Sequence, residues 1–69
     1  MPITTKMIQA IRQAMTEAGI NQMQLAQKSG VQRATISRIL NGHQDDVLLS
    51  TLRDIAKACD CSVSDLLGE

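Results

Sequence analysis

The side chains able to do covalent or metal chemistry are few in this chain of 69 residues. Cys59 and Cys61 stand in a C-x-C spacing, and His43 is the single histidine. This set is too small for a structural zinc site, and no spacing suggests a nucleophile held beside a base. We therefore expect no enzyme, no metal, no cofactor and no small-molecule ligand. Both cysteines are interpreted as small buried side chains in a reducing cytoplasm.

A second group of polar side chains suits hydrogen bonding rather than covalent chemistry. Gln32, Arg33, Ser37 and Arg38 lie within one short stretch of the chain. Exposed Arg and Gln side chains are most often only the solvated face of a helix. They become a recognition surface only when the surrounding elements hold them together on one free face, so the elements decide the interpretation.

Composition and charge limit the partners that such a surface can have. The chain contains no Phe, Trp or Tyr, which excludes the aromatic stacking platforms used for single strands and RNA bases. Formal charge sums to zero, but residues 1–44 carry five basic residues against one acidic, and residues 45–69 two against six. No apolar run approaches the length of a membrane span, about 18 residues. The basic half is therefore where an anionic partner is expected.

Apolar residues recur at helical spacing almost throughout, which predicts an all-α fold of five short helices. The expected helices cover residues 5–18, 22–29, 32–40 and 49–59, with a last short helix after Ser62. Thr4 or Thr5, Asn21 and Ser62 are candidate N-caps. Gly19 and Gly30 suit the left-handed position that ends a helix. No segment alternates with period two for long enough to predict a strand.

Residues 22–40 predict two short helices joined by a tight turn. Gly30 stands where the backbone needs a positive φ, and Ala26 is small enough for close helix approach. Val31, Ile36 and Ile39 fill the wedge between the helices. This is helix-turn-helix geometry, in which the second helix projects from the domain and can enter a DNA major groove.

The segment NQMQLAQKSGVQRATISRILNG resembles the helix-turn-helix of the phage Cro/repressor and XRE family of transcriptional regulators. The downstream LRDIAKACDCSVSDLL is similar to the closing helices of that family. The resemblance implies a lambda-repressor-like, five-helix DNA-binding domain over residues 1–69. It also implies binding to a double-stranded operator as a two-fold dimer, with repression of transcription as the expected outcome.

Two departures from the family pattern carry their own expectations. Where the family has an Arg–Glu ion pair between the first and third helices, this chain has Met15 and Leu40, and we expect these two side chains to touch. Replacing a buried ion pair by packed apolar side chains is often neutral or stabilising. Asp60 stands where the family favours Gly, and Asp tolerates the left-handed conformation better than most residues.

The resemblance and the helical period together indicate which side chains meet DNA. Ile36, Ile39 and Leu40 define the buried side of the expected recognition helix, residues 32–40. Arg33 is the leading candidate for guanine, since its fork matches O6 and N7. Base readout is expected from Gln32, Arg33, Ala34, Ser37 and Arg38. Phosphate contacts are expected from Asn21, Gln22, Thr35, Asn41, His43 and Gln44.

Two readings of function stay open on the sequence alone. The leading one is a sequence-specific cytoplasmic regulator, encoded by a bacterium or a phage, with its acidic fourth and fifth helices facing away from DNA. The other is an antitoxin-like or other protein-interaction module that uses those acidic helices as its working surface. A dimer interface is expected near Val47, Leu48, Val63 and Leu67. Whether the chain is complete or the N-terminal part of a longer repressor is left open.

Overall fold

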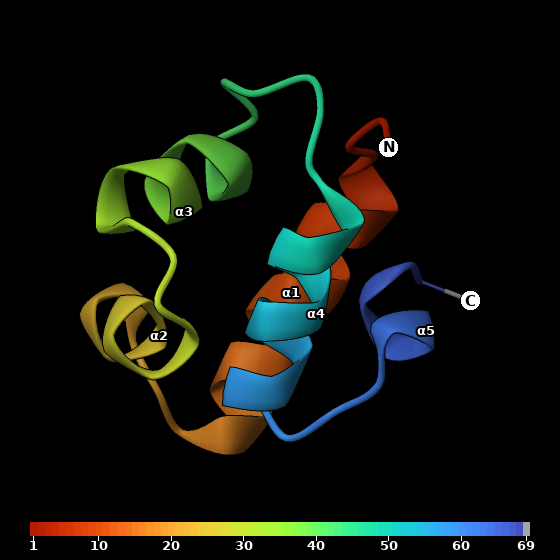
Figure 1. Ribbon diagram of the computed structural model, residues 1–69. Coiled ribbons are helices and arrows are strands. Elements are labelled where there is room, and N and C mark those ends of the chain that lie inside the picture. The colour runs from red at the N-terminus through yellow and green to blue at the C-terminus, as the bar shows by residue number, and fades with distance from the viewer. Residues whose placement is uncertain (69) are drawn as a thin grey trace.

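A computed structural model describes residues 1–68 and arranges them as five helices (Figure 1). The helices are α1 (Thr5–Ala18), α2 (Gln22–Ser29), α3 (Arg33–Leu40), α4 (Leu49–Ala58) and α5 (Val63–Leu66). Within the described residues there is no strand, only an isolated bridge between Pro2 and Asp46. The all-α prediction is confirmed. Gln32 and Cys59, predicted as helical, are instead the N-cap of α3 and the C-cap of α4.

Local side-chain hydrogen bonds explain where three of the helices begin. The Thr4 hydroxyl accepts from the Met7 amide at 3.1 Å at the start of α1. Asn21 and Gln24 form a reciprocal capping box at α2, with bonds of 2.8 and 2.9 Å. Ser62 and Asp65 form the same arrangement at α5. Each bond satisfies an amide that a helix end otherwise leaves without a partner.

The turn between α2 and α3 depends on one backbone conformation. Gly30 has φ of 76° and donates its amide to the Ala26 carbonyl at 3.0 Å. A Cβ built on Gly30 would meet nothing within 4 Å, so glycine is required here for its positive φ and not for space. Asp60 likewise adopts φ of 55° between α4 and α5, as the sequence predicted.

The core lies where the five helices meet. Its fully buried side chains come from every helix: Ile11, Leu25, Ile36, Ile39, Leu52, Ile55 and Leu66. α3 packs against α1 and α2, while α5 packs against α1 and α4 (Figure 1). The core therefore holds α3 from behind and leaves its opposite face free. No helix among residues 1–68 has the length and apolar character needed to cross a membrane.

The segment before α1 ties down the loop that follows α3. The Val47 amide donates to the Met1 carbonyl and the Ile3 amide donates to the Asp45 carbonyl, both at 2.9 Å. These bonds turn Val47 inward, where it is buried with the core. Val47, expected near a dimer interface, is therefore a core residue, and its side chain is not available to a second copy. Leu48, its neighbour, is 72% exposed.

Candidate nucleic-acid interface

The free face of α3 begins at its N-terminal end. Gln32, Arg33 and Ala34 are exposed, while Ile36, Ile39 and Leu40 face the core. Gln32 has extended backbone angles, and its side chain makes no capping hydrogen bond to the helix. The three side chains at this end therefore extend into solvent from a rigidly packed helix, which is the arrangement a major-groove reader requires.

The Arg38 side chain makes two hydrogen bonds, one within α3 and one to the loop that follows it. Its Nη2 donates to the Thr35 hydroxyl at 3.3 Å, and its Nε donates to Gln44 Oε1 at 3.4 Å. The side-chain Nε2 of Gln44 in turn donates to the backbone carbonyl of Asp46 at 2.8 Å. The chain of bonds restricts the guanidinium before any partner arrives, which lowers the ordering cost of a later contact.

Ser37 and Asn41 form a pair one turn apart on the same face of α3. Asn41 Nδ2 donates to Ser37 Oγ at 3.2 Å, so both side chains already have one partner. His43 is exposed in the loop beyond them, and its amide donates to the Arg38 carbonyl at 2.9 Å. The predicted polar residues of α3 and the following loop thus lie at or near the surface, outside the core-facing side of the helix.

Asn21 and Gln22 stand apart from that group, at the start of α2. The Asn21 side chain is engaged as the N-cap, accepting from the Gln24 amide. Gln22 is the first helical residue and is partly exposed. The helix dipole and the free first-turn amides make this end a place where a phosphate is favoured.

Arg12 supports the end of α3, a role that was not predicted from the sequence. From α1 its Nη2 donates to the carbonyl oxygen of Leu40, the last residue of α3, at 2.9 Å. The last carbonyls of a helix lack intrahelical donors and carry partial negative charge, so a guanidinium there caps the helix. The signal was in the sequence, since Arg12 lies one turn before Met15 and so shares its side of α1.

Met15 and Leu40, the apolar substitutes for the family's ion pair, are both buried in the same core cluster. Both side chains therefore belong to the core that α1 and α3 share, and Arg12 adds a hydrogen bond between these two helices. No charge is left unpaired in the core, and among the described residues no buried polar side-chain atom lacks a partner. Direct contact between Met15 and Leu40 stays a prediction.

Acidic residues are distributed unevenly around this interface. Asp60 and Asp65 belong to the turn before α5 and to α5 itself, which lie across α1 and α4 from α3 (Figure 1). Asp45 and Asp46 instead follow α3 directly, and Asp46 pairs with the Met1 α-amino group at 2.9 Å. α5 thus lies away from α3, as expected for the acidic helices, whereas Asp45 and Asp46 belong to neither helix and lie in the loop that follows α3.

Two short helices, a glycine turn and an exposed second-helix face define a helix-turn-helix protein. The family model for Helix-turn-helix matches residues 11–66, and the chain belongs to this family of DNA-binding transcriptional regulators. Among curated proteins, a search finds no match.

The chain is similar in structure to the restriction-modification controller protein C.AhdI from Aeromonas hydrophila. Identity is 30%, with a TM-score of 0.80, over 88% of this chain and 91% of that one. The fold of α1 to α5 is therefore shared over nearly the whole length of both chains.

Proposed function

We propose that residues 1–69 act as one domain that represses transcription by binding a specific double-stranded operator. α3 lies in the major groove in this proposal, and the protein works by binding alone, without catalysis. The exposed N-terminal end of α3, with its apolar side fixed in the core, is the observation that carries it. The similarity to phage repressors supports repression as the outcome.

The side chains divide into readers and supports. Gln32, Arg33 and Ala34 contact base edges, with Arg33 on guanine O6 and N7 and the Ala34 methyl against a thymine methyl. Ser37 and Arg38 follow one turn later, where Arg38 reaches a base or a phosphate. Thr35 and Gln44, which were predicted as phosphate contacts, are also proposed to hold Arg38 in place, because each accepts one of its hydrogen bonds.

Phosphate contacts fix the register of the helix on the duplex. We assign this role to Gln22 with the first-turn amides of α2, and to Asn41 and His43 beyond the end of α3. Asn21 contributes through its capping of α2, which positions those amides. Few cations lie near this surface, so the number of phosphates neutralised is small and the salt dependence of binding is shallow.

The decisive experiment selects preferred duplexes from a random pool and then titrates the best duplex and a scrambled one at two salt concentrations. We expect a clear preference for the selected duplex and weaker binding to both at the higher salt. Binding without sequence preference, or no binding at low salt, would reject the proposal and favour the antitoxin-like alternative.

A two-fold dimer follows from the geometry of operators. One domain of this size contacts a single half-site, and half-sites are spaced about 34 Å apart, one helical turn. Two exposed large apolar side chains, Leu48 and Leu49, lie at the start of α4 with exposures of 72% and 42%, and we propose that they contact a second copy together with Met1. Met23 is also exposed but lies on α2. Val63 and Leu67, which were predicted for the same surface, are partly buried against the core and follow the other end of α4.

Equilibrium sedimentation over a range of micromolar concentrations tests the dimer. We expect a monomer–dimer equilibrium that shifts to the dimer when the selected duplex is present, because two half-sites raise the effective concentration. A monomer under all these conditions, with one protein bound per duplex, would reject it.

A further inference from the structure

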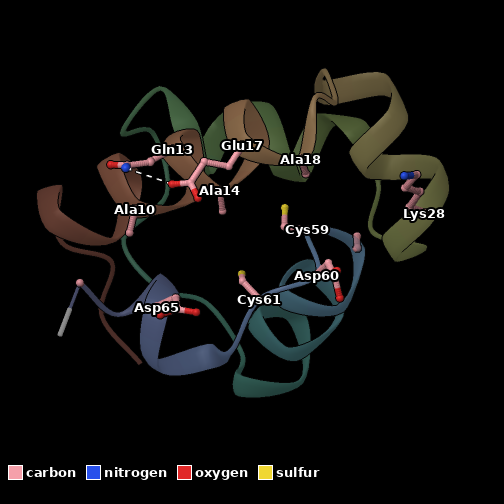
Figure 2. Close-up of a pocket in the computed structure, with 12 residues that line it drawn as sticks. Ala10, Gln13, Ala14, Glu17, Ala18, Lys28, Cys59, Asp60, Cys61 and Asp65 are labelled. Carbon is pink, nitrogen blue, oxygen red and sulfur yellow. Dashed lines mark hydrogen bonds between the residues drawn. The ribbon is translucent and has the colours of Figure 1, made fainter.

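A groove on the side of α1 away from α3 is not used by the proposed DNA contacts. It has a volume of about 720 Å³ and runs between α1 and the turn that joins α4 to α5 (Figure 2). Figure 2 shows the thiols of Cys59 and Cys61 directed toward α1 across this space. Its apolar floor consists of Ala10, Ala14, Ala18, Ala58, Cys59 and Cys61.

Carboxylates surround that floor. Glu17 lies on the α1 side, and Asp60 and Asp65 lie on the opposite side, while one cation, Lys28, stands at the α2 end (Figure 2). Within residues 1–68 none of the three carboxylates forms an ion pair; Glu17 only accepts from the Gln13 amide at 3.1 Å. The rim of the groove therefore carries a net negative charge, with three carboxylates against the single cation Lys28.

The pKa of the Cys61 thiol depends on its burial and on the negative charge around the groove. Burial raises the pKa of the Cys61 thiol, and the charges of Asp65, Asp60 and Glu17 raise it further. The three carboxylates thus act on one point in the groove, although they come from α1, the α4–α5 turn and α5. A cation placed there would be favoured by all of them.

The part of the apolar floor that α1 supplies has a surface on which a second helix can pack. Ala10, Ala14 and Ala18 follow one another at i, i+4 and i+8, so they form a continuous strip of small side chains. Eight residues of α-helix span about 12 Å, or roughly two turns. Small residues along such a strip let a second helix approach closely, and the carboxylates flank the space it would occupy.

We propose that this groove docks a short basic helix of a partner protein. The helix lays small or apolar side chains against the alanine strip and directs Lys or Arg toward Glu17, Asp60 and Asp65. α3 lies on the other side of α1, so the partner and DNA bind at the same time. The inference concerns a surface separate from the DNA interface and does not depend on the operator proposal.

The test uses a fluorescent helical peptide of about three turns with Ala on one face and Lys on its flanks. A matched peptide with Glu in place of Lys is the control. We expect the Lys peptide to bind the full chain at low ionic strength, more weakly as salt rises, and the Glu peptide not to bind. A selected DNA duplex should leave the peptide's affinity unchanged.

Two variants examine the groove itself. Glu17→Gln with Asp60→Asn removes two carboxylates without changing side-chain size. This double variant should lower the affinity for the Lys peptide about fivefold, as expected for two exposed charge pairs. The matched control, Asp45→Asn with Asp54→Asn, removes two carboxylates outside the groove and should change the affinity less than twofold. Ala14→Met fills the alanine strip and should abolish binding. Circular dichroism and duplex binding establish that each variant is folded.

Several results would overturn the proposal. These are equal binding of the Lys and Glu peptides, no binding of the Lys peptide at low salt by protein that circular dichroism shows to be folded, or equal loss in the control variant. Self-association of the protein that Ala14→Met abolishes would show that a second copy occupies the groove instead. Because duplex binding is measured in parallel, failure of the DNA proposal is seen separately.

Discussion

Arg33 is the first residue of α3 and carries an exposed guanidinium that makes no hydrogen bond to the rest of the described chain. Arg38, five residues later, is tethered to Thr35 and Gln44. The two arginines therefore differ: the Arg33 side chain is free to adapt to a base edge, while the Nε and Nη2 groups of Arg38 are already engaged within the protein.

Arg33→Ala should weaken binding to the selected duplex by about 1–3 kcal/mol and relax preference at one position per half-site. The reason is loss of the bidentate pairing to guanine, which phosphate contacts cannot replace. Repeating the duplex selection with the variant measures both effects. Lys57→Ala, which removes a cation from the end of α4, is the control and should leave the selected sequence unchanged. If Arg33→Ala selects the same duplex sequence as the wild type, Arg33 does not contact a base.

Arg12 acts at the same scale but through the end of α3. Arg12→Met should lower the free energy of unfolding by about 1 kcal/mol, because the Leu40 carbonyl loses its donor at a partly exposed site. Affinity should fall by a similar factor for selected and scrambled duplexes, since no base contact is lost. Thermal melting and duplex titration measure the two.

Arg12→Lys separates the hydrogen bond from the charge. Lys keeps the positive charge but not the planar fork of Arg. Compared with Arg12→Met, we therefore expect Arg12→Lys to restore the salt-dependent affinity for duplex DNA more fully than the free energy of unfolding. Full stability in Arg12→Met would show that the Leu40 bond contributes nothing.

At the scale of the elements, α2 is the support on which α3 rests. α2 packs against both α3 and α4, and Leu25 is the one side chain of α2 that is fully buried. A short helix of this kind contributes little stability by itself, because isolated helices under about 12 residues are marginal in water. The position of α3 therefore depends on the packing of α2.

Leu25→Ala should destabilise the fold by about 2–5 kcal/mol, because it leaves a cavity where three helices meet. In a chain this small that loss takes most of the stability, and DNA binding should disappear with it. Met23→Ala, on the exposed side of the same helix, should change stability by less than about 0.5 kcal/mol. Urea unfolding followed by circular dichroism measures both variants. Equal effects would show that α2 does not anchor α3.

For the whole molecule, the thiols set an upper pH limit on stability. Burial raises the pKa of Cys59, with a further increase from Cys61 and a decrease from Lys28, and burial likewise raises that of Cys61. The folded state therefore holds these protons more tightly than the unfolded state. The stabilisation is fully present below the ordinary thiol pKa of 9.0 and is lost as pH rises above it.

We expect the midpoint of urea unfolding to be unaffected by the thiols up to about pH 8 and to fall as the pH rises above 9.0, the ordinary thiol pKa. Cys59→Ala with Cys61→Ala should show a smaller fall over the same range. An identical pH profile for the wild type and the double variant would mean that other groups cause the alkaline loss.

The effect of the charge distribution depends on how the fold places the basic and acidic residues. A formal charge of zero conceals a basic first half and an acidic second half. The fold places α5 and its acidic residues across α1 and α4 from α3, which separates the DNA interface from the acidic groove. It also brings Asp45 and Asp46 beside α3, which a division of the chain by residue number did not anticipate.

Local signals in the sequence were enough to determine the helices and the turn. Thr4, Asn21 and Ser62 act as caps within their own first turns, and Gly30 sets the turn through its own φ. The resemblance of residues 21–42 and 52–67 to the Cro/repressor family then indicated the helix-turn-helix and the face of α3 that is proposed to meet DNA. These features are predictable because each depends on residues a few positions apart.

Tertiary structure decided what depends on distant residues. The Arg12–Leu40 bond joins α1 to α3, and the burial of Val47 depends on backbone bonds to the N-terminal segment. The groove exists only because α5 folds back against α1, bringing Asp65 opposite Glu17. Helical period specifies which side of a helix is apolar, but not which helix covers it. Contacts between segments far apart in the chain are set by how all five helices pack at once.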